Sequence, residues 1–164
     1  MIFDIWYSKT MTQLELALNN KSSELMEAVS KKEGTSISFL KKGIASGIIV
    51  ILNNKKRLIK KPCAIGKGLS TKINVNIGTS GDEIDVGDEL QKLKVACLAG
   101  ADTVMDLSVG GDIPKIRKIL IKDSDIPFGT VPIYDAAQGA AKNKGSLLKM
   151  TAEDILGVIR SQAE

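Results

Sequence analysis

The sequence predicts an α/β fold in which a helical lead-in precedes three strand–helix units of a parallel sheet. Three observations support this prediction. Apolar residues recur at helical spacing in the first third of the chain, and strand-like and helix-like patterns alternate in the remainder at intervals of roughly thirty residues. The composition, with 43% hydrophobic and 26% charged residues in a chain of 164, is that of a globular protein large enough to bury a core.

The first third of the chain is predicted to be mainly helical. Apolar residues at helical spacing over 14–18 and again over 25–29 predict two short amphipathic helices. Residues 36–42 predict a third helix, which Gly43 and Gly47 are expected to end. The compact run at 48–52 is apolar and rich in β-branched residues, so it predicts a strand after the helices.

The rest of the chain alternates strands with helices. Strands are expected at 72–77, 103–107 and 129–133, and helical stripes of apolar residues at 90–97, 113–120 and 136–141. Ser80 and Glu83 have the spacing of a capping box and are expected to open the first of these helices, as Thr151 and Asp154 are expected to open a final one. Because a helix between consecutive strands is the usual crossover of parallel strands, this order predicts a parallel sheet.

Three strand–helix units leave two architectures open. A (β/α)8 barrel holds eight units in about 250 residues, which is close to the interval seen here. Three units cannot close such a barrel. The chain therefore forms either a short open α/β sheet or the first part of a larger fold.

The residue types of the sequence exclude several kinds of chemistry. The chain has no histidine, which excludes a Ser–His or Cys–His catalytic pair and a His-ligated zinc site. Its two cysteines, Cys63 and Cys97, form neither a CxxC pair nor a disulfide framework, so the cytoplasm is the expected location. No apolar run approaches the roughly 18 residues of a membrane span, and no membrane partner is expected. No catalytic residue and no metal ligand is predicted within the chain.

Positive charge concentrates between residues 55 and 67. The residues that carry it are Lys55, Lys56, Arg57, Lys60, Lys61 and Lys67. No aromatic residue interrupts this run, so it offers no platform on which nucleic-acid bases could stack. Leu58 and Ile59 at its centre are typical of a segment that packs locally. We interpret the run as a solvated loop and expect no nucleic-acid partner; contact with RNA or phosphate through these basic residues is the alternative.

Polar residues stand at the carboxyl ends of the predicted strands, where parallel α/β sheets bind their ligands. Asn76, Met105 and Tyr134 follow one another at equal intervals of 29 residues. We therefore expect them at matching heights of three neighbouring strands, facing one mouth. An amide, a thioether and a phenolic hydroxyl together suit a small heterocyclic ligand, so these three residues are the predicted substrate-binding site.

Longer motifs around these residues resemble one enzyme family. They are Ile65-Gly-Lys-Gly-Leu69, Lys72-Ile-Asn-Val-Asn-Ile-Gly-Thr-Ser80, Ala99-Gly-Ala-Asp-Thr-Val-Met-Asp-Leu-Ser108, Gly110-Gly-Asp-Ile113 and Gly129-Thr-Val-Pro-Ile-Tyr134. In sequence, order and spacing they resemble the phosphomethylpyrimidine synthases of thiamine biosynthesis. The resemblance covers Met11 to Glu164, which is essentially the whole chain.

The resemblance implies a radical S-adenosylmethionine lyase on a (β/α)8 barrel. This chain would hold the helical lead-in and the first three strand–helix units, so the barrel is incomplete. Such enzymes convert 5-aminoimidazole ribotide to 4-amino-5-hydroxymethyl-2-methylpyrimidine phosphate through a 5′-deoxyadenosyl radical made at a [4Fe–4S] cluster, and they also bind a divalent metal. The family's Asn, Met and Tyr substrate contacts fall on Asn76, Met105 and Tyr134.

The resemblance also divides the chain and shows what the chain lacks. Residues 1–10 are interpreted as an upstream extension, 11–70 as the lead-in and 71–164 as the first part of the barrel domain. The family's cluster-binding cysteine motif and metal-binding histidines do not occur in these 164 residues, so this chain alone is expected to be inactive. Val109 and Asp135 stand where the family has Thr and Gln.

Three interpretations of the chain follow. It is the amino-terminal fragment of the synthase, a truncated paralogue without catalysis, or one subunit of a split enzyme. In the second and third cases it acts as a binding or interaction module that pairs through its open sheet edge. The expected partner is a second copy of the chain in a homo-oligomer or a complementary carboxy-terminal chain, beside the small-molecule substrate 5-aminoimidazole ribotide.

Overall fold

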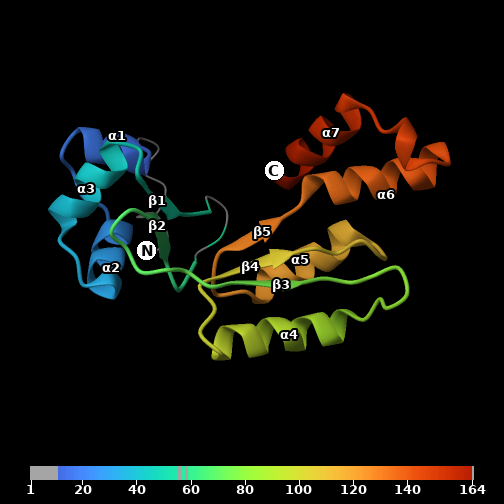
Figure 1. Ribbon diagram of the computed structural model, residues 1–164, viewed down its shortest axis with the longest axis horizontal. Helices are drawn as coiled ribbons and strands as arrows, with labels where there is room; N and C mark the ends of the chain where they lie inside the picture. The colour runs from blue at the N-terminus through green and yellow to red at the C-terminus, as the bar shows by residue number, and fades with distance from the viewer. Residues whose placement is uncertain (1–10, 55–56, 58, 164) are drawn as a thin grey trace, which may run out of the picture. The chain divides into compact units, whose positions relative to one another are not determined.

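The computed structural model describes residues 11–163 apart from 55, 56 and 58 (Figure 1). Two compact units divide the chain, residues 1–72 and residues 73–164. In the described residues, the first unit combines helices with a two-stranded antiparallel sheet, and the second combines helices with a three-stranded parallel sheet. The predicted α/β class and the predicted parallel sheet are therefore confirmed.

The described part of the first unit begins with three short helices. They are α1 (Gln13–Leu18), α2 (Glu24–Glu33) and α3 (Ile37–Ala45). Side-chain oxygens of Thr12, Ser23 and Ser36 accept backbone hydrogen bonds at the three N-termini, which satisfies donors that have no partner within a helix. The core that the helices share with the neighbouring sheet consists of Ala17, Met26, Val29, Leu40, Ile44, Ile49, Ile51 and Ala64. The three helices predicted for this part of the chain are thus confirmed.

A hairpin completes this core. Strand β1 (Ile49–Leu52) pairs antiparallel with β2 (Cys63–Gly66), and Val50 lies opposite Ile65. The sequence predicts β1 but not β2, because four residues that follow a proline carry too little alternation to indicate a strand. Pairing with β1, rather than local pattern, makes this segment extended.

Gly43 lies inside α3 rather than at its end, which corrects the predicted boundary. A Cβ atom at this position would lie 2.4 Å from Cδ1 of Ile49 in β1. Glycine is therefore used here to let the hairpin approach the helix closely, and its low helix propensity does not stop the helix. The helix continues to Ala45, and Gly47 just beyond it has a φ of +73°.

In the basic connection between β1 and β2, one apolar residue among those described is buried. Ile59 is buried, whereas Lys60 and Lys61 are exposed, as expected for a solvated loop with a local anchor. Lys55, Lys56 and Leu58 of the predicted run lie outside the described residues.

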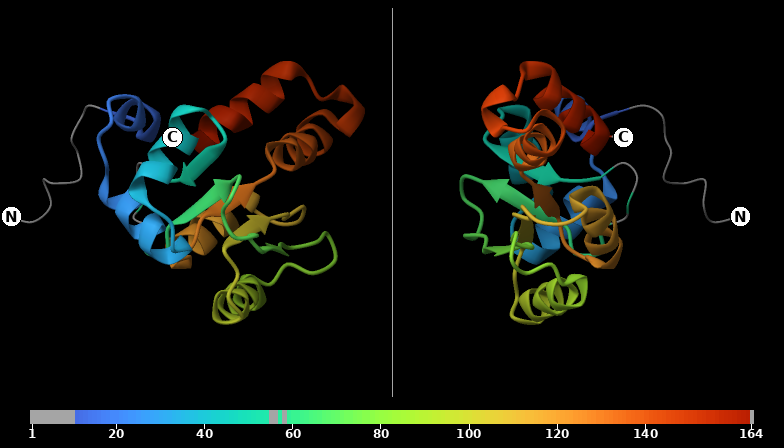
Figure 2. Two further views of the ribbon diagram at one scale, coloured as in Figure 1. Left: turned by 60° about the vertical axis from the view of Figure 1, so that its left-hand side comes forward. Right: turned by 90° about the vertical axis from the view of Figure 1, so that its right-hand side faces the viewer.

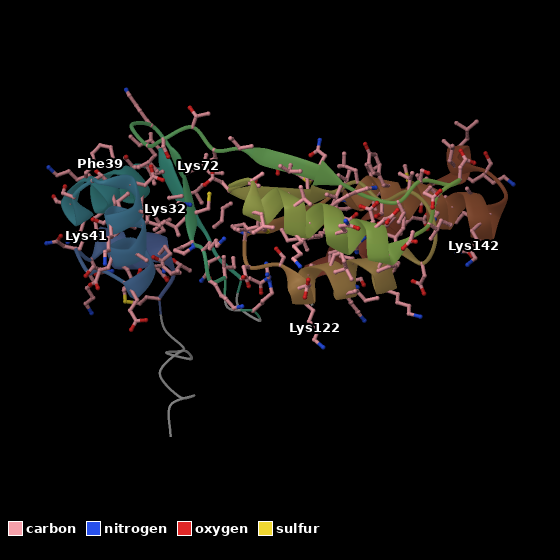
Figure 3. The ribbon with its side chains drawn as sticks, turned by 90° about the horizontal axis from the view of Figure 1, so that it is seen from below. Lys32, Phe39, Lys41, Lys72, Lys122 and Lys142 are labelled. Atoms are coloured by element: carbon pink, nitrogen blue, oxygen red, sulfur yellow. The ribbon has the colours of Figure 1, made fainter. Side chains whose placement is uncertain are left out.

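Residues 66–72 fold back onto the helices of the first unit. Glu33 at the end of α2 accepts a hydrogen bond from the backbone N–H of Ser70 and pairs with Lys72, both at 2.9 Å. Burial raises the pKa of Glu33, but the hydrogen bonds from Ser70 and Lys72 outweigh it and hold this pKa below its ordinary value. Phe39 of α3, labelled in Figure 3, lies against Gly68 in the same segment, where a Cβ atom would be 2.8 Å from Cζ of its ring.

Three parallel strands form the centre of the second unit, in the order β3–β4–β5. They span Asn74–Ile77, Thr103–Asp106 and Phe128–Thr130. Helix α4 (Val86–Leu98) connects β3 to β4, and α5 (Ile113–Asp123) connects β4 to β5. The two helices share one core with the sheet (Figures 1 and 2), formed by Ile77, Leu93, Ala96, Ala101, Val104, Ile116, Leu120 and Ile126.

Helix α4 begins later than predicted. Its N-cap is Asp85, whose carboxylate accepts two backbone hydrogen bonds from the first turn. Ser80 and Glu83 form a separate turn instead. The backbone N–H of Glu83 donates to the Ser80 hydroxyl, and the backbone N–H of Ser80 donates to the Glu83 carbonyl oxygen, both at 3.0 Å. Because the Glu83 side chain takes no part, the predicted capping box is wrong.

The buried stripe of α4 is narrower than predicted. Leu93 and Ala96 are buried against the sheet, whereas Val95 is 57% exposed. A residue two positions from Leu93 lies about 200° around a helix, so Leu93 and Val95 cannot both face the sheet.

Two helices end the second unit. α6 (Pro132–Lys144) and α7 (Ala152–Ala163) are joined through a short 3₁₀ turn at Leu147–Lys149 and lie side by side (Figures 1 and 2). Lys144 donates to Asp154 at 2.5 Å, and Thr151 donates to the same carboxylate through its backbone N–H at 2.7 Å. The predicted start of the last helix at Thr151 and Asp154 is confirmed.

The contacts of Asp154 make the α6–α7 pair sensitive to acid. The hydrogen bond from Lys144, with those from Thr151, lowers the pKa of Asp154 to about 2. The ionised Asp154 carboxylate stabilises the helix pair fully at a pH above about 4, the ordinary pKa of an aspartate. This stabilisation is lost as the pH falls from there through about 2. We expect NMR titration of the Asp154 carboxyl carbon to give a midpoint near 2, and Lys144→Met to move it toward 4. A midpoint that Lys144→Met leaves unchanged would contradict the ion pair.

Among the residues that the structure describes, none of the helices has both the length and the apolar character needed to span a bilayer.

Candidate functional site

The sheet of the second unit has a core face and a polar face. Val75, Ile77 and Val104 contribute to the core under α4 and α5. Since successive side chains of a strand point to opposite faces, the intervening residues form the polar face, which we define as Asn74, Asn76, Thr103 and Met105. In the register of β3 and β4, Asn76 lies directly opposite Met105. The prediction that these two residues share one height is therefore confirmed.

The third strand contributes a glycine to this row. Gly129 of β5 is the register partner of Met105. A Cβ atom on Gly129 would lie 3.0 Å from Sδ of Met105, so the thioether rests over the glycine backbone. A larger residue at position 129 would displace Met105 from the polar face.

Tyr134 does not lie on a strand, which corrects its predicted place. β5 ends at Thr130, and α6 begins at Pro132, so Tyr134 stands in the first turn of that helix. Proline lacks the N–H that a sheet ladder needs and is favoured at the first position of a helix, which explains why the predicted strand 129–133 stops early. Tyr134 is 39% exposed and follows β5 at the carboxyl edge of the sheet, beyond the height of Asn76 and Met105.

Buried polar residues join the loops that follow β3 and β4. The Asp106 carboxylate accepts from the backbone N–H and the hydroxyl of Ser108 at 2.9 and 2.5 Å. The Ser108 hydroxyl in turn accepts from the backbone N–H of Thr79 at 3.1 Å. Thr79 donates its own hydroxyl to the carbonyl oxygen of Gly110 at 2.7 Å. All three side chains are buried, so the two loops form one fixed edge beside Asn76 and Met105.

A second buried carboxylate holds the start of the β3 loop. Glu89 of α4 is 2% exposed and accepts from the backbone N–H of Gly78 at 2.7 Å and from Lys92 at 2.6 Å. Because Gly78 directly follows Ile77, the end of β3, this contact ties the loop to the helix that covers the sheet.

Comparison with known proteins identifies the family to which the chain belongs. The family model described as the radical SAM ThiC family matches residues 12–164. The chain belongs to the radical SAM ThiC family. Its curated relatives include proteins named phosphomethylpyrimidine synthase, for example from Dehalococcoides mccartyi, with 52% identity over 154 residues, from Moorella thermoacetica, with 47% over 154, and from Thermus thermophilus, with 45% over 155.

These relatives are considerably longer than the chain. Each alignment covers 94% of this chain and 35 or 36% of the relative. The chain thus spans about a third of the length of the curated relatives it matches. Membership of the ThiC family confirms the resemblance seen in the sequence motifs.

The sequence does not predict the contacts of four residues that shape this edge of the ThiC chain. Thr79, Glu89, Asp106 and Ser108 were not expected to interact with one another. The sequence does contain one indication of this interaction, because the polar residue Asp106 interrupts an apolar strand and Ser108 follows it two residues later. A polar residue at that point must find hydrogen-bond partners if it is buried, but the sequence does not show which loop supplies them.

Asp135, the residue after Tyr134, is held in place by side chains of two neighbouring helices. Arg117 of α5 pairs with its carboxylate at 2.5 Å, and Gln162 of α7 donates to it at 3.3 Å. Both side chains of the ion pair are about 10% exposed. At position 135 this ThiC chain has an Asp, where the resemblance leads one to expect Gln. The negative charge of Asp135 is balanced by the buried Arg117.

The residues of the chain do not fit the cluster that the family name implies. A [4Fe–4S] cluster needs three or four thiolates, and the sequence has two cysteines. Cys63 is buried in β2 of the first unit, and Cys97 lies on α4 of the second. Within the described part of the chain, no three His, Cys, Asp or Glu side chains form a group that could hold a metal ion.

Proposed function

We propose that this chain is the amino-terminal part of a phosphomethylpyrimidine synthase, which converts 5-aminoimidazole ribotide to 4-amino-5-hydroxymethyl-2-methylpyrimidine phosphate in thiamine biosynthesis. The observation that carries the proposal is the polar face: a ThiC-family chain places Asn76 and Met105 side by side on neighbouring strands, at the carboxyl edge of a parallel sheet. In this proposal the three strands belong to a (β/α)8 barrel, and the polar face is turned to the barrel interior.

The residues of this chain bind and orient the substrate. The Asn76 amide offers hydrogen bonds to the aminoimidazole, Met105 gives an apolar, polarisable contact to the flat ring, and the Tyr134 hydroxyl closes the site from the first turn of α6. Gly129 leaves the space in which Met105 lies. The buried loop network keeps the edge of this site fixed before the ligand arrives.

The radical chemistry requires groups that these residues do not supply. When bound, the cluster and S-adenosylmethionine supply the radical, and their ligands belong to the remaining two-thirds of the enzyme. Those residues are carried by the same polypeptide or by a complementary carboxy-terminal chain. A homo-oligomer is the arrangement expected if the barrel is completed between copies.

The proposal predicts that Asn76 and Tyr134 contribute to substrate affinity. We expect the purified chain to bind 5-aminoimidazole ribotide in a calorimetric titration, and Asn76→Ala and Tyr134→Phe each to weaken it by about tenfold, the effect of losing one hydrogen bond to a ligand. Asn143→Ala, an exposed amide near the end of α6, is the matched control and should leave the affinity unchanged. Equal affinity in all four proteins would remove these residues from the site.

The same sample distinguishes the alternative, an interaction module without catalysis. Gel filtration at several concentrations, with and without the ribotide, gives the mass of the species that binds. A discrete folded species that binds the ribotide supports a substrate half-site. A discrete oligomer that ignores the ribotide supports the interaction module, since its exposed strand edges then serve association alone.

A further inference from the structure

The polar face contains a directed chain of hydrogen bonds that ends on Asn76. Thr103 of β4 is the register partner of Asn74 of β3, and its hydroxyl donates to Oδ1 of Asn74 at 2.8 Å. Nδ2 of Asn74 donates in turn to Oδ1 of Asn76 at 2.9 Å. Two strands therefore cooperate in holding one amide.

The direction of each bond is dictated by the previous one. A carbonyl oxygen can only accept and an amide NH2 can only donate. Once the Thr103 hydroxyl donates to the oxygen of Asn74, the NH2 of Asn74 is turned toward Asn76, and Asn76 must turn its oxygen toward Asn74. The NH2 of Asn76 then lies on the other side of the amide, and it donates to no residue that the structure describes.

We propose that Thr103 and Asn74 are positioning residues that present Asn76 to the ligand as a hydrogen-bond donor. The ligand atom that meets the NH2 of Asn76 is therefore an acceptor. Resting on the proposed function, this assigns the unprotonated ring nitrogen or an oxygen of 5-aminoimidazole ribotide, and not its exocyclic amine, to the NH2 of Asn76. A site that fixes the polarity of its amide discriminates against a ligand turned the wrong way, because two donors then face each other.

A purely structural role for these bonds predicts something different. Asn74 and Asn76 are exposed, so water competes for their hydrogen bonds, and the bonds add little to stability. Valine replaces threonine at nearly equal shape and is favoured in strands. Thr103→Val should therefore leave the fold intact while releasing both amides, and Thr103→Ser, which keeps the hydroxyl, should preserve their orientation.

The experiment has one readout that needs no ligand. In ¹H–¹⁵N spectra of the whole chain, we expect Thr103→Val to shift the side-chain NH2 signals of both Asn74 and Asn76 and to speed exchange of the Asn74 protons, and Thr103→Ser to restore the original pattern. Thr130→Val removes the hydroxyl of another strand threonine, which donates to Gln162 at 2.6 Å, and should leave these signals unchanged. Unchanged signals in Thr103→Val would overturn the relay.

The second readout is affinity for 5-aminoimidazole ribotide. We expect Thr103→Val and Asn74→Asp to weaken binding by about fivefold, Thr103→Ser to restore it, and Asn76→Asp, which has no donor, to weaken it by at least about tenfold. If Asn76→Asp binds as tightly as the original chain, Asn76 does not act as a donor and the proposal is wrong. If the original chain does not bind the ribotide, the proposed function fails, and the amide signals still decide whether Thr103 orients Asn76.

Discussion

Replacing Gly110 by alanine is expected to lower the free energy of unfolding by about 3 kcal/mol and to abolish ligand binding at the carboxyl edge of the sheet. A Cβ atom at this position would lie 1.9 Å from the carbonyl oxygen of Ser80 and 2.5 Å from its carbonyl carbon. Both are backbone atoms, so no side-chain rotation relieves the overlap. The loops must separate, which breaks the bonds of Thr79 to Val109 and to Gly110. Urea unfolding followed by circular dichroism measures the loss.

Gly81 provides the matched control for this prediction. It lies in the same pair of loops, and a Cβ atom there would meet nothing within 4 Å. Gly81→Ala should therefore change the unfolding free energy by no more than about 0.5 kcal/mol. If Gly110→Ala unfolds at the same urea concentration as Gly81→Ala, the backbones of the two loops do not approach each other this closely.

The sequence predicts the row of Asn76 and Met105 because a repeated unit sets their spacing. Each of these residues is the third in its strand, and one complete strand–loop–helix–loop unit of 29 residues separates them, so equal position in the repeat becomes equal height in the sheet. The next interval has the same length but not the same content. Gly129 follows Met105 by 24 residues because the connection through α5 is shorter. The remaining five residues of the interval complete β5 and reach Tyr134 in the first turn of α6. Equal spacing was therefore informative once and misleading once.

The sequence offers two possible N-caps for α4, and local pattern alone does not show which of them begins the helix. Ser80 with Glu83 and Asp85 with its following turn both resemble N-caps. The structure uses Asp85 for the helix and Ser80 for a turn, because the β3 loop must first reach Gly110 and pair with Val109. That requirement comes from the next strand–helix unit, about thirty residues away, and no local pattern contains it.

The same limit explains why the residues around the site were harder to predict than its central pair. Asp106 and Ser108 look like ordinary polar residues at the end of a strand, where solvent could satisfy them. They are buried because Thr79, from the preceding loop, covers them and donates its backbone N–H to Ser108. A relay between loops is a property of the assembled sheet, whereas the alternation that predicts a strand is a property of four or five adjacent residues.

Asp106 is the residue on which this relay depends. It is 3% exposed, and one of its oxygens, Oδ1, accepts both the backbone N–H and the hydroxyl of Ser108. Removing the carboxylate leaves these two donors without their acceptor, and it frees the Ser108 hydroxyl that holds the backbone of Thr79. A buried donor that loses its partner costs about 1–3 kcal/mol, because it has given up water without gaining a replacement.

We therefore expect Asp106→Ala to lower the free energy of unfolding by about 3 kcal/mol, and Asp106→Asn, which keeps an acceptor oxygen at Oδ1, by about 1 kcal/mol. Urea unfolding gives both values, and hydrogen exchange at the backbone N–H of Thr79 tests the mechanism, since this proton should lose its protection in Asp106→Ala and keep most of it in Asp106→Asn. Equal losses in the two variants would mean that the charge of Asp106, rather than its acceptor oxygen, holds the loops together. Protection of the Thr79 proton in both variants would show that Ser108 keeps its position without Asp106.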